Sequence, residues 1–466
     1  MKIFNYTGVK IILSGKIGPQ RCLKVIYRIL VCMLFFQPFD SLLIAQKVDT
    51  LRLDDVIDLT LENNYNIVVA ENNVELARKN AENGAVGFYP TISLSGNYNY
   101  NQNNYSLTEF ANPQMENIEE RGAVTESYNA GINVNYNLLS WGKRTYRLDV
   151  AQKNVYLQQQ SLELQVEQSV LNAVLQYLNA VNYYAQMLVE LENLENSQRR
   201  FQRAQEQYRY GQYTRLQLLN AEVDLRTDSA NFIRTKVDYK NAITRLNNEM
   251  GIQLDEDHPV DTSLTIDRSL SYENLLDQSL NNNPNYLSAK ASVNNAELQV
   301  RINEADRYPT LDVSGGYSFS TTEYEANFLN LTQNLGWNAG ISLNYNIFDG
   351  GRVRRNIETA ELELRNRQEE LEVARRQMVA NLQVAWQNYQ NNLELLSFYK
   401  RDVETAKLNY ERSLLAIKTG QLTGLELREA QLRLTRARNS LIQAMIQAKR
   451  SELNLYFYSG SLVDQN

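Results

Sequence analysis

Residues 340–346, with the sequence GISLNYN, alternate apolar and small polar side chains and lead into a long segment without proline. Residues 131–137, GINVNYN, carry the same pattern 209 positions earlier. Further along, Gly211 and Gly420 are separated by the same 209 positions, so the two copies align without insertion or deletion. The sequence therefore predicts a tandem duplication of one structural unit whose length is fixed.

Long helices are expected in both repeats, because residues 143–209 and 352–418 contain neither glycine nor proline. At 1.5 Å per residue, each would be roughly 100 Å long. Apolar residues follow two adjacent stripes at steps of three and four, which predicts neighbours on both sides. Shorter helices are expected at residues 53–86, 214–250, 271–306 and 423–458. We expect the first two of these to stack end to end beside the first long helix.

Four segments of strict alternation predict β-strands, at residues 91–100, 128–138, 310–319 and 337–348. One face of each is apolar and the other is built from Asn, Ser, Thr and Gly. Such segments are typical of a membrane β-barrel, although a soluble antiparallel sheet packed on a core gives the same alternation. We favour the barrel, because the polar face suits a wet lumen and Tyr and Trp stand near the strand ends. Residues 101–127 and 320–336 are then expected to be loops at the outer end.

Composition excludes several classes of function. The chain has 466 residues and a net charge of −7, and the part after residue 45 is more acidic still, which argues against a nucleic-acid scaffold. No nucleotide-binding, metalloprotease or hydrolase motif occurs. The single histidine, His258, lies in the linker 252–269, which is acidic and expected to be solvated, without a second His or Cys. We therefore expect no catalysis, no cofactor and no metal site.

The first 45 residues have the order of an export signal, with Lys24 and Arg28 before a short apolar run. That run is too short to cross a bilayer. Cleavage after Ala45 is expected, and a disordered tail is the less favoured alternative. Both cysteines, Cys22 and Cys32, fall within this segment, so the mature chain would have no disulfide. The mature chain would then hold a first repeat with its linker, 46–269, and a second repeat, 270–466.

Each long helix is followed by a turn with a recurring pattern, 210–214 in the first repeat and 419–423 in the second. Its glycine suits a left-handed residue that ends a helix, and its threonine suits the cap of the next helix. Glu426 is expected to complete a capping box, whereas Glu429 has no capping duty and by itself would be a solvated residue. A ring of these two carboxylates at the open end of a tube would favour cations.

The order and duplication of these features resemble the TolC family of outer-membrane efflux proteins. The resemblance covers almost all of residues 53–460, and the motifs that carry it are Tyr308-Pro309, residues 346–352 (NIFDGGR) and residues 419–427 (TGQLTGLEL). It implies a homotrimer, in which three chains with four strands each form a twelve-stranded barrel on a periplasmic α-helical barrel. Strand counting agrees with an oligomer, since four strands cannot close a barrel, but it also allows a dimer or tetramer.

The resemblance also implies a function and partners. It implies a passive export duct of a tripartite efflux or type I secretion system, placed in outer-membrane lipid and opened at its helical tip. A periplasmic adaptor and an inner-membrane transporter would be its partners. Glu426 and Glu429 would form the constriction, and Gln217 and Leu422 stand where some members carry an acid and an arginine. The turn residues expected at the adaptor docking site are Gly211, Gln212, Thr214, Gly420, Gln421 and Thr423.

Two other classes of function remain as alternatives. A trimeric coiled-coil adhesin of the cell surface would have exposed helices and no lumen-type strands, and the Asn-rich alternating segments argue against it. A soluble scaffold is the third reading, and it would purify without detergent as a monomer. The sequence does not identify the exported substrate.

Overall fold

The computed structural model describes residues 50–107, 118–253, 259–325 and 330–463. The expected signal peptide at 1–45 and the acidic linker residues 255–258 lie outside the described residues. Asp49–Asn466 form a single unit by their contacts. Within the described ranges, every helix is either too short or too polar to serve as a membrane span.

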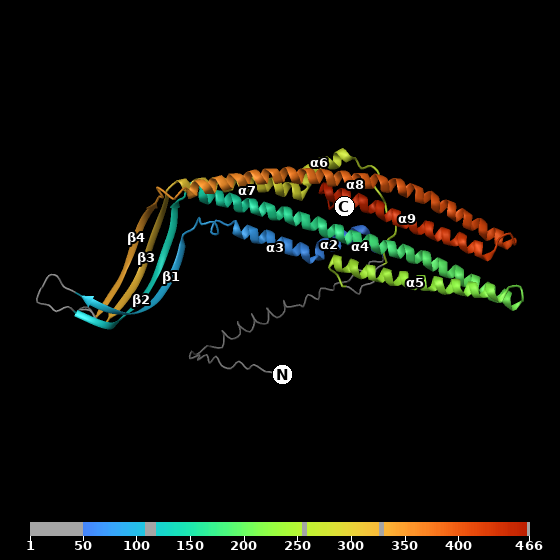
Figure 1. Ribbon diagram of the computed structural model, residues 1–466, viewed down its shortest axis with the longest axis horizontal. Helices are drawn as coiled ribbons and strands as arrows, with labels where there is room; N and C mark the ends of the chain where they lie inside the picture. Colours follow the sequence, from blue (N-terminus) through green and yellow to red (C-terminus); the bar gives the residue numbers. More distant parts are fainter. Residues whose placement is uncertain (1–49, 108–117, 254–258, 326–329, 464–466) are drawn as a thin grey trace, which may run out of the picture. The chain divides into compact units, whose positions relative to one another are not determined.

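Four antiparallel strands form one sheet in the order β1–β2–β3–β4 (Figure 1). The register places apolar side chains in rows across the sheet: Leu94 pairs with Ile132, Ile132 with Tyr317, and Tyr317 with Trp337. These four side chains are between 51% and 81% exposed, so the apolar face is uncovered within one chain. The sheet is open, because β1 and β4 are paired on one edge only.

The strands are longer at the loop end than expected. Their bounds are Thr91–Leu107, Ile118–Leu139, Thr310–Tyr324 and Leu331–Asn344 for β1 to β4. Much of 101–127 and 320–336, expected to be loop, is therefore strand. Of the expected strands 91–100, 128–138, 310–319 and 337–348, the starts at 91 and 310 are confirmed and the other bounds were wrong. Backbone pairing continues through polar residues, for example Asn101 with Thr125, after the apolar alternation has stopped. At the other end, β4 stops at Asn344, because its partner Thr310 follows Pro309, which has no N–H to donate.

Two antiparallel helix pairs follow the strands (Figure 1). The long helices α4 (Lys143–Arg209) and α8 (Arg352–Lys418) have the bounds expected from the segments without glycine or proline, 143–209 and 352–418. Each packs along its return helix, α5 (Arg215–Met250) or α9 (Gly424–Ser459), and α4 also contacts α9. The return helices begin one residue later than expected, because Thr214 and Thr423 are their N-caps.

The helices expected at 53–86 and 271–306 are each broken in two. The first consists of α2 (Leu53–Asn63) and α3 (Tyr65–Asn80), and the second of α6 (Tyr272–Asn282), α7 (Pro284–Glu304) and the short 3₁₀ helix η1 (Ala305–Arg307). Asn64 and Asn283 leave the helical conformation and cap the following helix with their side-chain oxygens. In the second repeat the break also suits Pro284, which stands in the first turn of α7.

The end of each return helix meets the break of the corresponding short helices. Asn64 donates its side-chain amide to the carbonyl of Glu249 at 2.8 Å, and Asn283 donates to Tyr458 at 3.0 Å. Because α3 and α5 both pack on α4, the expected end-to-end arrangement beside the long helix is confirmed in outline. The part that meets α5 is the α2–α3 break, not the end of a continuous helix.

Buried side chains gather where α2, α4 and α5 meet. Val170, Val174 and Leu178 on α4 are fully buried, together with Leu51 and Leu246. The connection between the repeats closes this region and was expected to be solvated. Instead Val260 is buried and bridges to Leu51, and hydroxyls of Tyr177 and Tyr389 donate to the carbonyls of Asp261 and Asp267. The connection therefore packs on both repeats.

Candidate functional site at the helix tips

The two turns between long and return helices are built alike. Gly211 has φ 72° and Gly420 has φ 73°, a left-handed conformation that glycine adopts without steric cost. This lets the N–H of Gln212 bond to the carbonyl of Gln207 at 2.8 Å. The N–H of Gln421 bonds to the carbonyl of Ala416 at 3.0 Å in the same way. Each bond satisfies a carbonyl in the last turn of its long helix.

Capping boxes open both return helices. The Oγ1 of Thr423 accepts from the N–H of Glu426 at 3.3 Å, and the Glu426 carboxylate accepts from the N–H of Thr423 at 2.8 Å. In the first repeat, Thr214 and Gln217 make the same two bonds, at 3.3 Å and 2.8 Å. An amide and a carboxylate therefore perform the same structural duty at equivalent positions.

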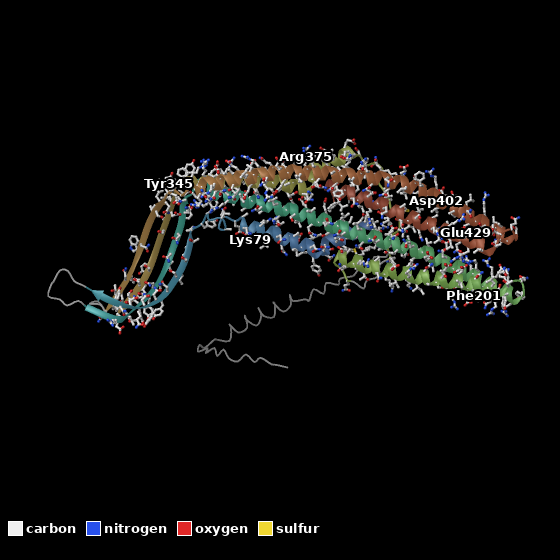
Figure 2. The ribbon with its side chains drawn as sticks, in the orientation of Figure 1. Lys79, Phe201, Tyr345, Arg375, Asp402 and Glu429 are labelled. Carbon is white, nitrogen blue, oxygen red and sulfur yellow. The ribbon has the colours of Figure 1, made fainter. Side chains whose placement is uncertain are left out.

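The two acidic residues of the second tip differ in their surroundings. Hydrogen bonds from the backbone N–H and hydroxyl of Thr423 lower the pKa of Glu426 below its usual value. Glu429 is exposed on α9 near the turn (Figure 2), and its carboxylate pairs with Arg433 at 2.6 Å. Both carboxylates stand on the first two turns of α9, so the second tip presents two negative charges, one of them partnered.

The first tip carries no acid at the equivalent places. Gln217 corresponds to Glu426, and Asn220 corresponds to Glu429, each at an offset of 209. The turn residues considered for docking, Gly211, Gln212, Thr214, Gly420, Gln421 and Thr423, are all exposed. The structure thus groups the expected residues into two similar turns, of which only the second has charge at the positions expected to form a constriction.

A buried ion pair above the second tip was not found by sequence reasoning. Arg428 on α9 binds Asp228 on α5 through two hydrogen bonds of 2.6 and 2.8 Å. The Asp228 side chain is 3% exposed and that of Arg428 is 11% exposed. Asp224 lies 3.6 Å from the same guanidinium. This pair joins the return helices of the two repeats within one chain.

Polar side chains of α4 extend the contact. Arg200 donates to the side-chain oxygen of Gln431 at 2.5 Å, and Gln431 donates to Asn193 at 3.0 Å. Burial lowers the pKa of Arg200, and the neighbouring positive charge of Arg428 contributes. The sequence did contain a signal for this ion pair, because the two repeats differ at these positions. Leu219 is equivalent to Arg428, and Ala437 is equivalent to Asp228.

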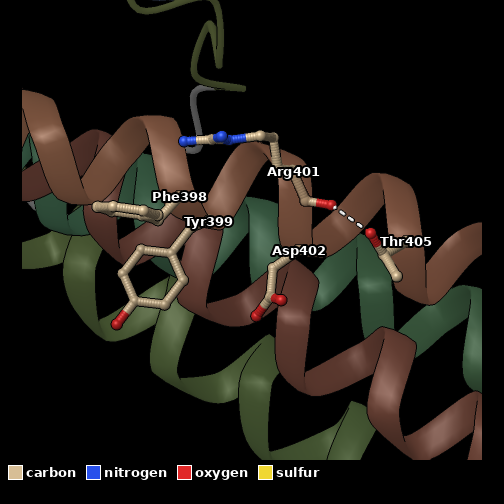
Figure 3. Close-up of a pocket in the computed structure, with 5 residues that line it drawn as sticks. All are labelled: Phe398, Tyr399, Arg401, Asp402 and Thr405. Carbon is tan, nitrogen blue, oxygen red and sulfur yellow. Dashed lines mark hydrogen bonds between the residues drawn. The ribbon is translucent and has the colours of Figure 1, made fainter.

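A shallow depression lies on α8, before the second tip turn (Figure 3). It is lined on α8 by Phe398, Tyr399, Arg401, Asp402 and Thr405. The guanidinium of Arg401 lies 5.2 Å from the ring centre of Phe398, which itself is 53% exposed. The depression therefore combines aromatic and polar side chains of α8, and the residues that line it form no grouping of catalytic side chains.

Comparison with known proteins relates this chain to outer-membrane efflux proteins. The family model described as outer membrane efflux protein matches residues 56–251 and 275–461. Outer membrane protein TolC of Salmonella enteritidis is 23% identical over 306 residues, which cover 62% of this chain and 62% of that protein. Cation efflux system protein CusC of Escherichia coli strain K12 is 22% identical over 420 residues, covering 87% of this chain and 85% of that protein.

A solved structure has the same fold. The CmeC outer membrane channel of Campylobacter jejuni superposes with a TM-score of 0.69 at 16% identity, over 88% of this chain and 86% of that one. The family match covers both repeats and hence most of the chain, as the resemblance of the motifs indicated. The chain therefore belongs to the outer membrane efflux protein family.

Proposed function

We propose that the chain is the outer-membrane channel of an efflux or secretion system. The observation that carries this proposal is the open four-stranded sheet with an uncovered apolar face. In water such a face would be unfavourable, whereas lipid would cover it. The row from Leu94 to Trp337 suits the outer wall of a barrel, and the opposite Asn-rich face suits its lumen. Copies of the chain would supply the remaining strands.

The helices also present faces that another copy would cover. Exposed apolar residues recur on α5 at heptad spacing: Leu216, Leu219, Val223, Ile233 and Val237. A comparable exposed stripe on α8 includes Leu395, Phe398, Leu408 and Leu415. We propose that α5 of one copy packs against α8 of the next. A closed ring of three copies would give a twelve-stranded barrel above a helical tube in the periplasm.

The tip turns would form the inner, gated end of this duct. Glu426 and Glu429 would make a constriction that prefers cations, with the charge supplied by the second repeat alone. The exposed turns would contact a periplasmic adaptor, and an inner-membrane transporter would supply the energy. The chain itself would act as a passive, non-enzymatic path across the outer membrane.

Single-channel recording from the full chain in planar bilayers tests this function. We expect stable unit conductance with preference for cations over anions. Replacing Glu426 and Glu429 by Gln should reduce that preference at unchanged assembly. A matched variant with Glu363→Gln and Glu369→Gln removes the same charge from exposed positions on α8 and should leave the preference unaltered. Unchanged selectivity in the tip variant would reject the proposed constriction. Absence of conductance would reject the proposed channel function.

A further inference from the structure

Both long helices begin with arginine residues spaced by three positions. Arg144 and Arg147 stand in the first two turns of α4, and Arg352 and Arg355 stand in the first turn of α8. Neither helix has an acidic residue in its first turn. Cations at a helix N-terminus are disfavoured by the partial positive charge of the unpaired N–H groups. Four arginines at the N-termini of two helices do not stabilise those helices, and this indicates that they have another role.

These four arginines, which we name the arginine collar, lack a carboxylate partner. Their neighbours Lys143 and Arg354 form ion pairs with Asp306 and Glu358. Among the described residues, no carboxylate lies within ion-pair distance of any collar arginine. The carboxylate of Asp349 accepts from the backbone N–H groups at the start of α8, and the charge of Arg352 acts on it without forming an ion pair. Arg144 and Arg355 donate to backbone carbonyls and have no ion-pair partner among the described residues.

The position of Arg144 shows which side of the sheet this member of the collar borders. Its guanidinium lies 5.1 Å from the ring centre of Tyr136 and 5.5 Å from that of Phe88. Tyr136 shares its face of β2 with Ile132 and Val134, which belong to the uncovered apolar face. Arg144 therefore borders the apolar face and not the Asn-rich face.

Exposed aromatic residues surround the same junction. Trp141 stacks on Tyr308 with 5.1 Å between ring centres and donates its indole N–H to the carbonyl of Pro309. Trp141 is also the one non-glycine residue with positive φ in the described part of the chain. Tyr345, which follows β4 (Figure 2), and Phe348 are 59% and 88% exposed. Exposed Trp and Tyr at this level are typical of a membrane–water interface.

The other end of the sheet has the opposite charge. Glu126 and Glu323 face each other across β2 and β3, on the same face as the apolar rows. The hydroxyl of Tyr128 donates to Glu126 at 2.8 Å. The apolar face therefore carries two carboxylates near its loop end, opposite the end where the helices and the collar arginines begin.

We propose that the arginine collar binds the phosphate groups of anionic phospholipids in the leaflet that meets the helix end of the sheet. This inference rests on the proposed function as a membrane channel. A guanidinium matches two phosphate oxygens with two parallel N–H donors. Attraction to an anionic leaflet amounts to about fivefold in binding for each cation near the surface. The collar thus fixes the depth of the sheet in the membrane by its headgroups as well as by its aromatic side chains.

Native mass spectrometry of the full chain, purified as its assembly in neutral detergent, tests the collar. The probes are phosphatidylglycerol and phosphatidylcholine of equal chain length. We expect phosphatidylglycerol to bind at least about tenfold more tightly, since several cations act together. A collar variant with all four arginines changed to Gln should lose this preference. Changing them to Lys instead should keep most of it, which separates lost charge from misfolding.

A control variant removes four exposed arginines distant from the junction: Arg203→Gln, Arg376→Gln, Arg412→Gln and Arg436→Gln. It should keep the preference, and millimolar inorganic phosphate should not displace the lipid. The proposal is overturned if the collar variant keeps the preference, if the control loses it equally, or if free phosphate competes. Conductance of the wild-type chain without lipid preference would reject the collar alone. Absence of conductance would reject the channel.

Discussion

Glu426 has a structural duty in the tip turn and a proposed duty in the constriction, and the tandem repeat allows the two to be separated. Its carboxylate completes a capping box, and Gln217 completes the same box in the first repeat without charge. The capping duty could be predicted from the spacing of threonine and glutamate. The pairing of Glu429 with Arg433 was not predicted, although the two residues stand four positions apart on one helix.

Replacing Glu426 by Gln should therefore remove charge without destabilising the tip. We expect the smaller effect from this change, because Gln keeps the capping hydrogen bond, whereas Thr423→Ala should cost ~1 kcal/mol because the cap is lost. Hydrogen exchange at the start of α9 measures the difference. Equal deprotection in both variants would contradict the account.

The charge of Glu426 should persist into acid. Its pKa is lowered from 4.5, so the cap contributes stability above that pH and loses it only as the pH falls through the lower value in the folded protein. We expect the cation preference due to this residue to survive at pH 4.5 in single-channel recordings. Loss of its contribution well above pH 4.5 would contradict this expectation.

The buried pair of Arg428 and Asp228 should be costly to break. Arg428→Gln removes the close cation from a carboxylate that is 3% exposed and leaves it only Arg200, at 4.0 Å, and breaking a buried pair costs about 3–5 kcal/mol. Combining Arg428→Met with Asp228→Leu should recover most of that loss. Hydrogen exchange along α5 and α9, with the double-mutant cycle, measures the coupling. A single-variant cost below ~1 kcal/mol would show that the pair does not hold the two helices together.

At the scale of elements, helices were easier to predict than strands. The ends of α4 and α8 are marked by glycines, so the sequence contains their bounds. The strand ends are set by backbone pairing and by Pro309. Side-chain alternation does not reveal these ends, because neither the polar extension of β1 nor the early end of β4 alters it. The helix breaks at Asn64 and Asn283 were not predicted, because asparagine is tolerated within helices. Only the hydrogen bonds to the return helices favour a non-helical conformation at these two residues.

Glycines of equal backbone conformation should differ in their sensitivity. Gly211 and Gly251 have φ of 72° and 74°, but a Cβ on Gly251 would lie 2.4 Å from the carbonyl oxygen of Asn63, while Gly211 has open space. We expect Gly211→Ala to cost ~1 kcal/mol and Gly251→Ala at least ~2 kcal/mol more, because the helix ends must separate. Thermal unfolding in detergent compares them, and Gly420 and Gly460 provide the same test in the second repeat. Equal losses within either pair would contradict the observed packing.

At the scale of the whole molecule, we propose that further copies of the chain cover the exposed apolar faces of the sheet and the helices. We expect Val223→Glu with Ile233→Glu to prevent assembly, because both side chains are about 60% exposed within one chain and would be buried between copies. Asn220→Glu with Asn241→Glu adds the same charge at exposed polar positions of α5 and should be tolerated. Mass photometry in detergent counts the copies. Normal assembly of the first variant would place the contact elsewhere.

The number of copies could not be read from one chain, because strand counting permits several closed rings. Electron cryo-microscopy of the full chain in lipid nanodiscs decides it most directly. We predict three copies around a continuous lumen, with the sheet in the lipid and the helix pairs projecting from one face. A particle without a lumen, or with strands outside the lipid, would contradict the proposal that this chain forms a conduit.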